Sequence, residues 1–149
     1  MNPVLVDTNV WIALTMDRHQ HHREALAWFD TLPDDHSACF CRMTQNSFLR
    51  LLTSKSIFHE DTMTNEQAIR TYRRFSLDPR IGWLDEPAKL EDAWFTAASV
   101  RSDSPKLWMD AYLSAFAHLA GAGLVTFDGG FRQYKSKGLD LILLASDEK

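Results

Sequence analysis

The sequence contains no hydrophobic run that approaches the length of a membrane span. A transmembrane helix needs about 20 consecutive apolar residues. The apolar stretch nearest the N-terminus is Val4-Leu5-Val6, which is too short for the hydrophobic region of a secretory signal and has no basic flank. We therefore expect a cytoplasmic protein that does not enter a membrane.

Cysteine is scarce, with only Cys39 and Cys41 in 149 residues. Their i, i+2 spacing would place both side chains on one face of a strand. The pair forms neither a Cys-x-x-Cys motif nor a zinc-binding framework. We expect two buried free thiols in a reducing compartment.

The chain also lacks an excess of positive charge, since 16 basic and 20 acidic residues give a net charge of -4. This balance argues against a protein that coats DNA through charge alone. It does not exclude a nuclease, because acidic residues hold metal ions and a local basic rim can recruit phosphate. With 45% hydrophobic residues and no repeats or Pro/Gly-rich linker, residues 1–149 should form a single domain with a substantial core.

Short apolar runs alternate with segments of helical periodicity along the whole chain. The predicted strands are residues 4–6, 38–41, 81–84, 124–127 and 141–144. The predicted helices are residues 10–14 (capped by Thr8 or Asn9), 22–30, 44–53, 65–77, 87–100 and 107–120. This alternation indicates a three-layer α/β fold, in which a central parallel sheet of four to five strands has helices on both faces.

Two acidic residues directly follow predicted strands. Asp7 follows the first strand and Asp128 follows the fourth. Ligands of open parallel sheets bind beyond the carboxyl ends of the strands, so neighbouring strands would bring both carboxylates into one crevice. A third acid, Asp110, lies among apolar neighbours at the start of the helix before the fourth strand, where an unpaired carboxylate is costly to bury. Stabilisation by the helix dipole is an alternative explanation for Asp110 alone.

Three converging carboxylates repel one another and stay ionised only around a cation. Carboxylate and water ligands suit Mg²⁺ or Mn²⁺. Such an ion lowers the pKa of a bound water and stabilises charge on a phosphate. We expect the polar side chains of Thr8, Asn9 and Thr126 to orient the carboxylates.

Four segments of the sequence resemble PIN domains, especially the VapC-type toxins of bacterial type II toxin–antitoxin pairs. They are residues 6–12 (VDTNVWI), 44–53 (TQNSFLRLLT), 110–115 (DAYLSA) and 124–131 (LVTFDGGF). The matches occur in the order typical of the family and cover essentially the whole chain.

The resemblance implies a PIN-like fold and a Mg²⁺-dependent endoribonuclease, with Asp7, Asp110 and Asp128 as its catalytic and metal-binding residues. It also implies a VapB-like antitoxin that blocks the acidic site, a homodimer, and an RNA substrate such as tRNA, rRNA or mRNA. Arg132 and Lys135 follow the late acid and are placed to meet RNA phosphates, although solubilising surface charge is an alternative role.

The chain departs from the family pattern at Ser47, where many relatives carry Glu, and at Gly130, where many carry an acid. These departures imply weaker metal binding, or one metal ion rather than two. Gln45 would then donate its carbonyl oxygen or hold a water, unless it makes only a helix-surface or cap contact. They also motivate an alternative function, a catalytically silent PIN-like module that binds RNA or protein. A phosphate-accepting receiver is disfavoured, because the chain lacks the paired acids and the late lysine expected there.

Overall fold

Five short parallel strands form the centre of the protein. The structure is a computed structural model that describes residues 2–144. The strands are β1 (Val4–Val6), β2 (Ala38–Phe40), β3 (Ile81–Trp83), β4 (Gly123–Thr126) and β5 (Leu141–Leu143). They pair in the order β3-β2-β1-β4-β5, and every pairing is parallel. The predicted parallel sheet is confirmed.

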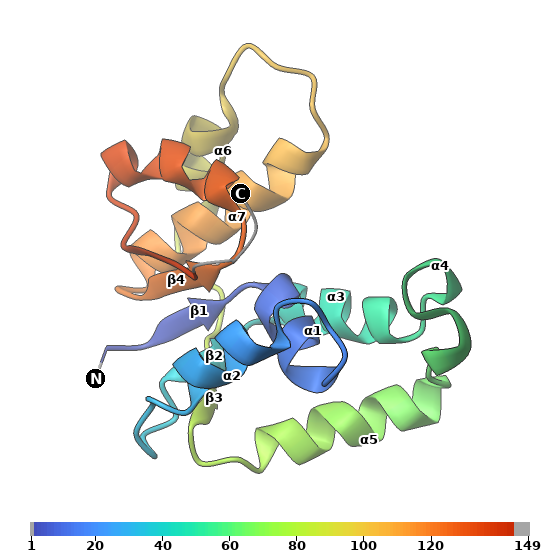
Figure 1. Cartoon of the computed structure of the whole chain (residues 1–149). Coiled ribbons are helices and arrows are strands. Elements are labelled where there is room, and N and C mark those ends of the chain that lie inside the picture. Colours follow the sequence, from blue (N-terminus) through green and yellow to red (C-terminus); the bar gives the residue numbers. More distant parts are fainter. Residues whose placement is uncertain (1, 145–149) are drawn as a thin grey trace.

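Helices cover both faces of this sheet (Figure 1). One face carries α1 (Thr8–Thr15), α2 (His22–Phe29), α3 (Arg42–Leu52) and α5 (Asn65–Ser76). The other carries α6 (Leu90–Ala98), α7 (Lys106–Leu119) and the 3₁₀ segment η2 (Gly129–Lys137). The short helices α4 (Lys55–Phe58) and η1 (His59–Asp61), which were not predicted, connect α3 to α5.

Strand β1 shows why the sheet is buried on both sides. Val4 and Val6 pack into the core beneath α1, whereas Leu5 packs into the core beneath α7. Successive strand residues point to opposite faces, so a strand covered on both sides must be apolar throughout. The continuous Val-Leu-Val run meets this requirement.

Five aromatic side chains, which we call the aromatic core, fill the layer between the sheet and helices α1, α3 and α5. They are Trp11, Phe40, Phe48, Tyr72 and Phe75. The rings of Trp11 and Phe40 stack with centroids 3.9 Å apart and an angle of 4° between their planes. Aromatic pairs in this geometry stabilise a core beyond the area that they bury.

The two cysteines are buried and free, as expected from their sequence context. Only Cys39 belongs to a strand, however, because β2 ends at Phe40. Cys41 is the N-cap of α3 and forms a capping box with Thr44, so the predicted strand is one residue too long. Burial, followed by the negative charge of Asp35, raises the pKa of the Cys39 thiol to about 11.

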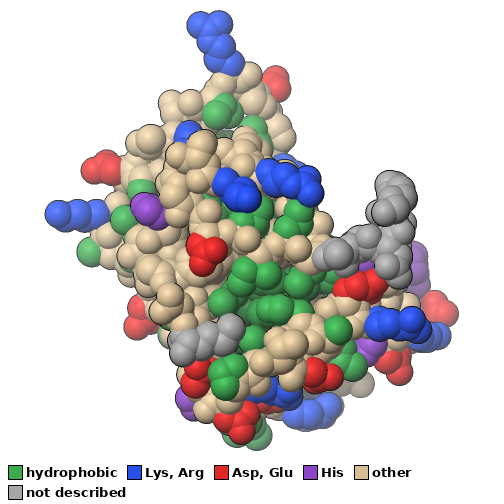
Figure 2. Space-filling model, turned by 60° about the vertical axis from the view of Figure 1, so that its left-hand side comes forward, with side chains coloured by type: hydrophobic (Ala, Val, Ile, Leu, Met, Phe, Trp, Pro, Cys, Tyr) green, Lys and Arg blue, Asp and Glu red, His purple; other side chains and the backbone are tan. Residues whose placement is uncertain are grey.

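Large apolar side chains also reach the surface. Phe95 on α6 and Trp108 on α7 are about half exposed, and their rings contact each other edge to face. On the side of the molecule shown in Figure 2, hydrophobic side chains gather in one patch with charged side chains around it. Within residues 2–144, no helix has the length and apolar character needed to cross a membrane.

Candidate active site

The carboxyl ends of β1 and β4 lie side by side, and each is followed by an acidic residue. Val6 of β1 pairs with Val125 of β4. Asp7 therefore emerges next to Thr126 and Asp128. We call the region formed by Asp7, Asp110 and Asp128 the acid edge. β1 and β4 are therefore neighbours in the sheet, as was required for Asp7 and Asp128 to lie in one crevice.

The carboxylate of Asp7 is held by two hydrogen bonds. Its Oδ1 accepts from the Thr8 backbone N–H at 2.8 Å, and its Oδ2 accepts from the Thr126 hydroxyl at 2.7 Å. Asp7 is thereby the N-cap of α1, so the predicted cap at Thr8 or Asn9 is wrong. A negative charge at a helix N-terminus is stabilised by the unsatisfied N–H groups there. Thr8 therefore orients the Asp7 carboxylate through its backbone N–H.

The hydroxyl of Thr126 joins the two strand-end acids. It is fully buried, and besides donating to Asp7 it accepts from the Asp128 backbone N–H at 3.0 Å and from Nδ2 of Asn9 at 3.3 Å. Oδ1 of Asn9 accepts in turn from the Phe127 N–H at 3.4 Å. The structure therefore brings Asn9 and Thr126 together with the acids that they were expected to orient.

Lys106, which was not predicted as a site residue, lies between Asp110 and Asp128. Nζ of Lys106 donates to Oδ2 of Asp128 at 2.6 Å and lies 3.5 Å from Oδ2 of Asp110. Lys106 is one helical turn before Asp110 on α7. Oδ1 of Asp128 accepts from the Gly130 N–H at 2.8 Å.

The three carboxylates differ in how readily they ionise. Burial raises the pKa of Asp7 to about 6, and the charges of Asp110 and Asp128 act in the same direction, against the hydrogen bonds from Thr126 and Thr8. Burial also raises the pKa of Asp110, against the opposing charge of Lys106. For Asp128, the hydrogen bonds from Lys106 and Gly130 outweigh burial and lower the pKa. Negative charge on Asp7 and Asp110 is therefore incompletely balanced.

A hard divalent cation fits this site by chemistry. In the described part of the chain, no three His, Cys, Asp or Glu side chains are already gathered as a ready metal-ligand set. The carboxylate oxygens of the three acids are nevertheless the ligand type that Mg²⁺ or Mn²⁺ prefers. A bound cation would also favour the ionised forms of Asp7 and Asp110, which burial disfavours. The ammonium of Lys106 supplies positive charge to two of the three acids.

The remaining predicted side chains lie at different places. Oε1 of Gln45 accepts a hydrogen bond from the Arg42 guanidinium, which favours the helix-surface alternative. Arg132 lies over the turn after Asp128, where a Cβ atom on Gly129 would be 2.7 Å from Nη1 of Arg132. Lys135 is exposed on η2.

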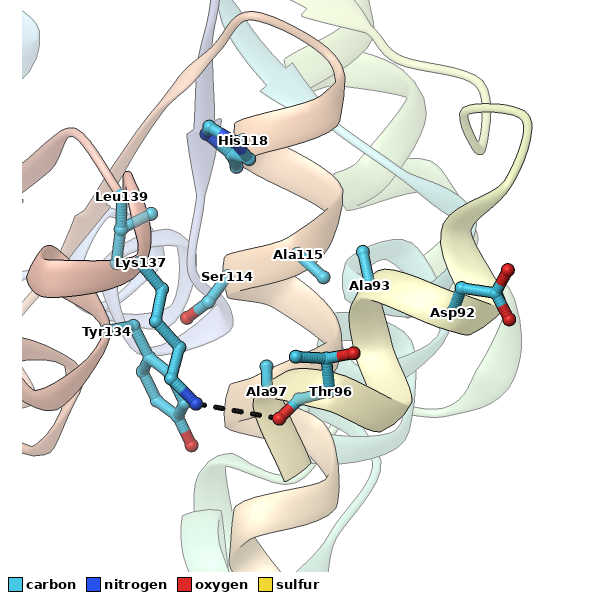
Figure 3. A pocket seen from close by; sticks show the side chains of 10 residues that line it. All are labelled: Asp92, Ala93, Thr96, Ala97, Ser114, Ala115, His118, Tyr134, Lys137 and Leu139. Carbon is cyan, nitrogen blue, oxygen red and sulfur yellow. Dashed lines mark hydrogen bonds between the residues drawn. The ribbon is translucent and has the colours of Figure 1, made fainter. Parts of the chain in front are cut away.

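A cavity of about 370 Å³ lies between α6, α7 and η2 (Figure 3). It is lined by Asp92, Ala93, Thr96, Ala97, Ser114, Ala115, His118, Tyr134, Lys137 and Leu139. Ser114 projects from α7, one turn after Asp110, and its hydroxyl has no hydrogen-bond partner among the described residues. Burial, followed by the charge of Asp110, raises the pKa of Tyr134, so this wall of the cavity lies near the acid edge.

Comparisons with known proteins identify the family of this chain. Residues 4–137 match the family description "PIN domain". The chain is 44% identical over 146 residues to "Ribonuclease VapC41" of Mycobacterium tuberculosis, covering 95% of this chain and 99% of the relative. It is 27% identical over 139 residues to "Ribonuclease VapC39" of the same organism, covering 93% and 98%.

Solved structures show the same fold at low sequence identity. The crystal structure of VapC20 from Mycobacterium tuberculosis, a sarcin-ricin loop cleaving toxin, superposes with a TM-score of 0.65 at 18% identity, covering 91% of this chain and 95% of the other. The DNA-bound VapBC of Salmonella typhimurium gives a TM-score of 0.60 at 17% identity, with 95% and 98% covered. The strand order, the acids at the ends of β1 and β4, and the family match over residues 4–137 lead to one conclusion: this chain belongs to the PIN-domain family.

Proposed function

We propose that this protein is a metal-dependent endoribonuclease and the toxin of a toxin–antitoxin pair, acting in the cytoplasm. Asp7, Asp110 and Asp128 hold Mg²⁺, for which Mn²⁺ substitutes, and the substrate is an RNA phosphodiester. The proposal is carried by the placement of Asp7 and Asp128 at the neighbouring ends of β1 and β4, joined through Thr126, with Asp110 linked to Asp128 through Lys106. A relative named as a ribonuclease, 44% identical over nearly the whole chain, supports it.

The residues of the acid edge have distinct tasks in this reaction. When bound, the divalent ion lowers the pKa of a coordinated water and stabilises charge on the phosphate. Thr126 and the N-terminus of α1 hold the Asp7 carboxylate in one orientation. Arg132 and Lys135, on the segment after Asp128, attract the phosphate chain towards an otherwise acidic protein.

The partner that we propose is a VapB-like antitoxin, together with a second copy of this chain. Structural neighbours include VapBC complexes from Salmonella typhimurium and Rickettsia felis. Exposed apolar side chains such as Phe95 and Trp108 supply surface of the kind that protein interfaces cover.

Replacing Asp7 tests the proposed reaction. We expect Asp7→Asn to abolish RNA cleavage while the circular dichroism spectrum stays that of the wild type. The matched control is Asp34→Asn, which removes one exposed carboxylate from a turn. Undiminished cleavage by purified Asp7→Asn protein would contradict the proposal.

A second candidate is a catalytically silent module that binds RNA or protein. The neutral residues Ser47 and Gly130, together with an ammonium already paired to two acids, favour it. Calorimetric titration with Mn²⁺ distinguishes the two functions. A silent module would bind no Mn²⁺ and would retain RNA intact during long incubation.

A further inference from the structure

We propose that Lys106 is an internal counterion of the acid edge. Its ammonium competes with the divalent ion for Asp110 and Asp128, and it pairs with an RNA phosphate instead once that ion is bound. This inference rests on the proposed ribonuclease function. Its starting point is that one ammonium contacts two of the three acids, at 2.6 Å and 3.5 Å.

Lys106 and a metal ion need the same atoms. Oδ2 of Asp128 accepts the Lys106 hydrogen bond, and Oδ2 of Asp110 faces the same Nζ. The side chains of the two acids are only 26% and 8% exposed, so their oxygens have limited access to other cations. A divalent ion held by these oxygens would repel the ammonium. Metal binding therefore requires Lys106 to leave.

Lys106 is able to move without disturbing the fold. Its side chain is 62% exposed, and its backbone is at the first residue of α7. The lysine side chain is a flexible four-carbon stem with a compact charge at its end. After displacement from the acids, the ammonium stays close to the acid edge, because the four-carbon side chain limits how far it can move. An RNA phosphate bound there would accept a charge-assisted hydrogen bond from it.

The position of Lys106 is unfavourable for the helix itself. A cation in the first turn of a helix opposes the helix dipole, and a basic residue four positions before an acid is the weaker order for a helical ion pair. The first turn of α7 contains no acidic residue. Helix stability therefore does not explain a lysine here, whereas a role at the acid edge does.

Calorimetry on the full chain without RNA tests the competition. We expect Lys106→Gln to bind Mn²⁺ about tenfold more tightly than the wild type, because no ammonium has to be displaced. Lys55→Gln, which removes an exposed lysine from α4, is the matched control and should leave Mn²⁺ affinity unchanged. Equal or weaker Mn²⁺ binding by Lys106→Gln, with wild-type binding intact, would overturn the competition.

RNA cleavage at saturating Mn²⁺ tests the transfer to phosphate. Lys106→Gln should raise KM for RNA several-fold, and Lys106→Arg should restore part of that loss because it retains the charge. A higher Mn²⁺ affinity combined with a higher KM for RNA is a pattern that a purely structural ion pair would not produce. An unchanged KM in Lys106→Gln would overturn the transfer. If wild type and Lys106→Gln both fail to bind Mn²⁺ and to cleave RNA, the proposed function fails with it.

Discussion

The acid edge begins one peptide bond away from the hydrophobic cluster that contains the aromatic core, since Val6 packs into this cluster and Asp7 begins the edge. In the core, apolar rings are closely packed, as in the stack of Trp11 on Phe40. At the edge, carboxylates are partly withdrawn from water and the pKa of Asp7 is raised to about 6. The aromatic core therefore stabilises the fold, while the acid edge retains unfavourable charge that a bound cation would neutralise.

Truncation in the aromatic core should have the largest effect on stability. Trp11→Ala removes a fully buried ring, and we expect the free energy of unfolding to fall by about 3–5 kcal/mol. Urea denaturation followed by circular dichroism measures this change. Trp11→Phe is the control, since it keeps a ring against Phe40 and removes an Nε1–H that has no acceptor within the described residues. Equal losses in both variants would show that stacking does not account for the effect.

The acid edge should respond in the opposite direction. Because the folded pKa of Asp7 is about 6 against an ordinary value of 3.8, the folded state binds more protons than the unfolded state between these values. The free energy of unfolding therefore falls as pH rises through this window, and the penalty is complete above it. At pH 7 without metal, Asp7→Asn should be more stable than wild type by about 2 kcal/mol.

Two controls accompany that measurement. The gain from Asp7→Asn should shrink as the pH falls from 6 and disappear well below the ordinary value of 3.8, where Asp7 is protonated in both states. Asp128→Asn should instead lose stability at pH 7, because hydrogen bonds from Lys106 and Gly130 lower the pKa of Asp128 in the fold. A loss of stability in Asp7→Asn at pH 7 would contradict the idea that this carboxylate is strained by burial.

The Thr126 hydroxyl shares features of the aromatic core and of the acid edge. It is fully buried, as Trp11 of the core is, and it hydrogen-bonds Asp7 and the backbone N–H of Asp128. Thr126→Val keeps the shape but leaves Asp7 and the Asp128 N–H without this partner. We expect a loss of about 1–3 kcal/mol in urea denaturation. RNA cleavage should fall in parallel, and Thr126→Ser should restore both. Wild-type cleavage in Thr126→Val would show that this hydroxyl does not position Asp7.

Ser114 should give the smallest effect. Its hydroxyl is buried beside the cavity, with no partner among the described residues, so its removal deletes no hydrogen bond. Ser114→Ala should change the free energy of unfolding by less than about 1 kcal/mol, with stabilisation the expected direction. A loss as large as that of Thr126→Val would reveal an ordered water or ligand bound to this hydroxyl.

The sequence was sufficient to place the sheet and the strand-end acids, because Asp7 and Asp128 directly follow short apolar runs. It was insufficient for the local contacts around them. Thr8 and Asn9 are good capping residues, so nothing in their identity showed that Asp7 itself caps α1. Lys106 was not predicted as a site residue, because a basic residue four positions before an acid is the weaker order for a helical ion pair, although the four-residue spacing from Asp110 was a usable signal.

The cavity and the position of Gln45 depend on packing that periodicity does not contain. Helices α6 and α7 line the cavity with small side chains such as Ala97 and Ala115. Their spacing predicts that these helix faces are buried, but it does not predict that a cavity remains between them. Gln45 was a candidate ligand by its place in α3. Its side chain instead accepts a hydrogen bond from Arg42, one turn earlier. The sequence does not predict this contact, because it depends on the rotamers of both side chains.

The two buried thiols provide a direct way to observe motion of the sheet. Cys39 lies in β2, between β1 and β3, and the raised pKa of its thiol keeps it in the unreactive protonated form. Cys41 is likewise buried, at the start of α3. Alkylation of either thiol therefore requires local opening of the structure. The rate of thiol labelling, compared with and without Mn²⁺, reports how strongly a cation at one end of the sheet restrains its centre.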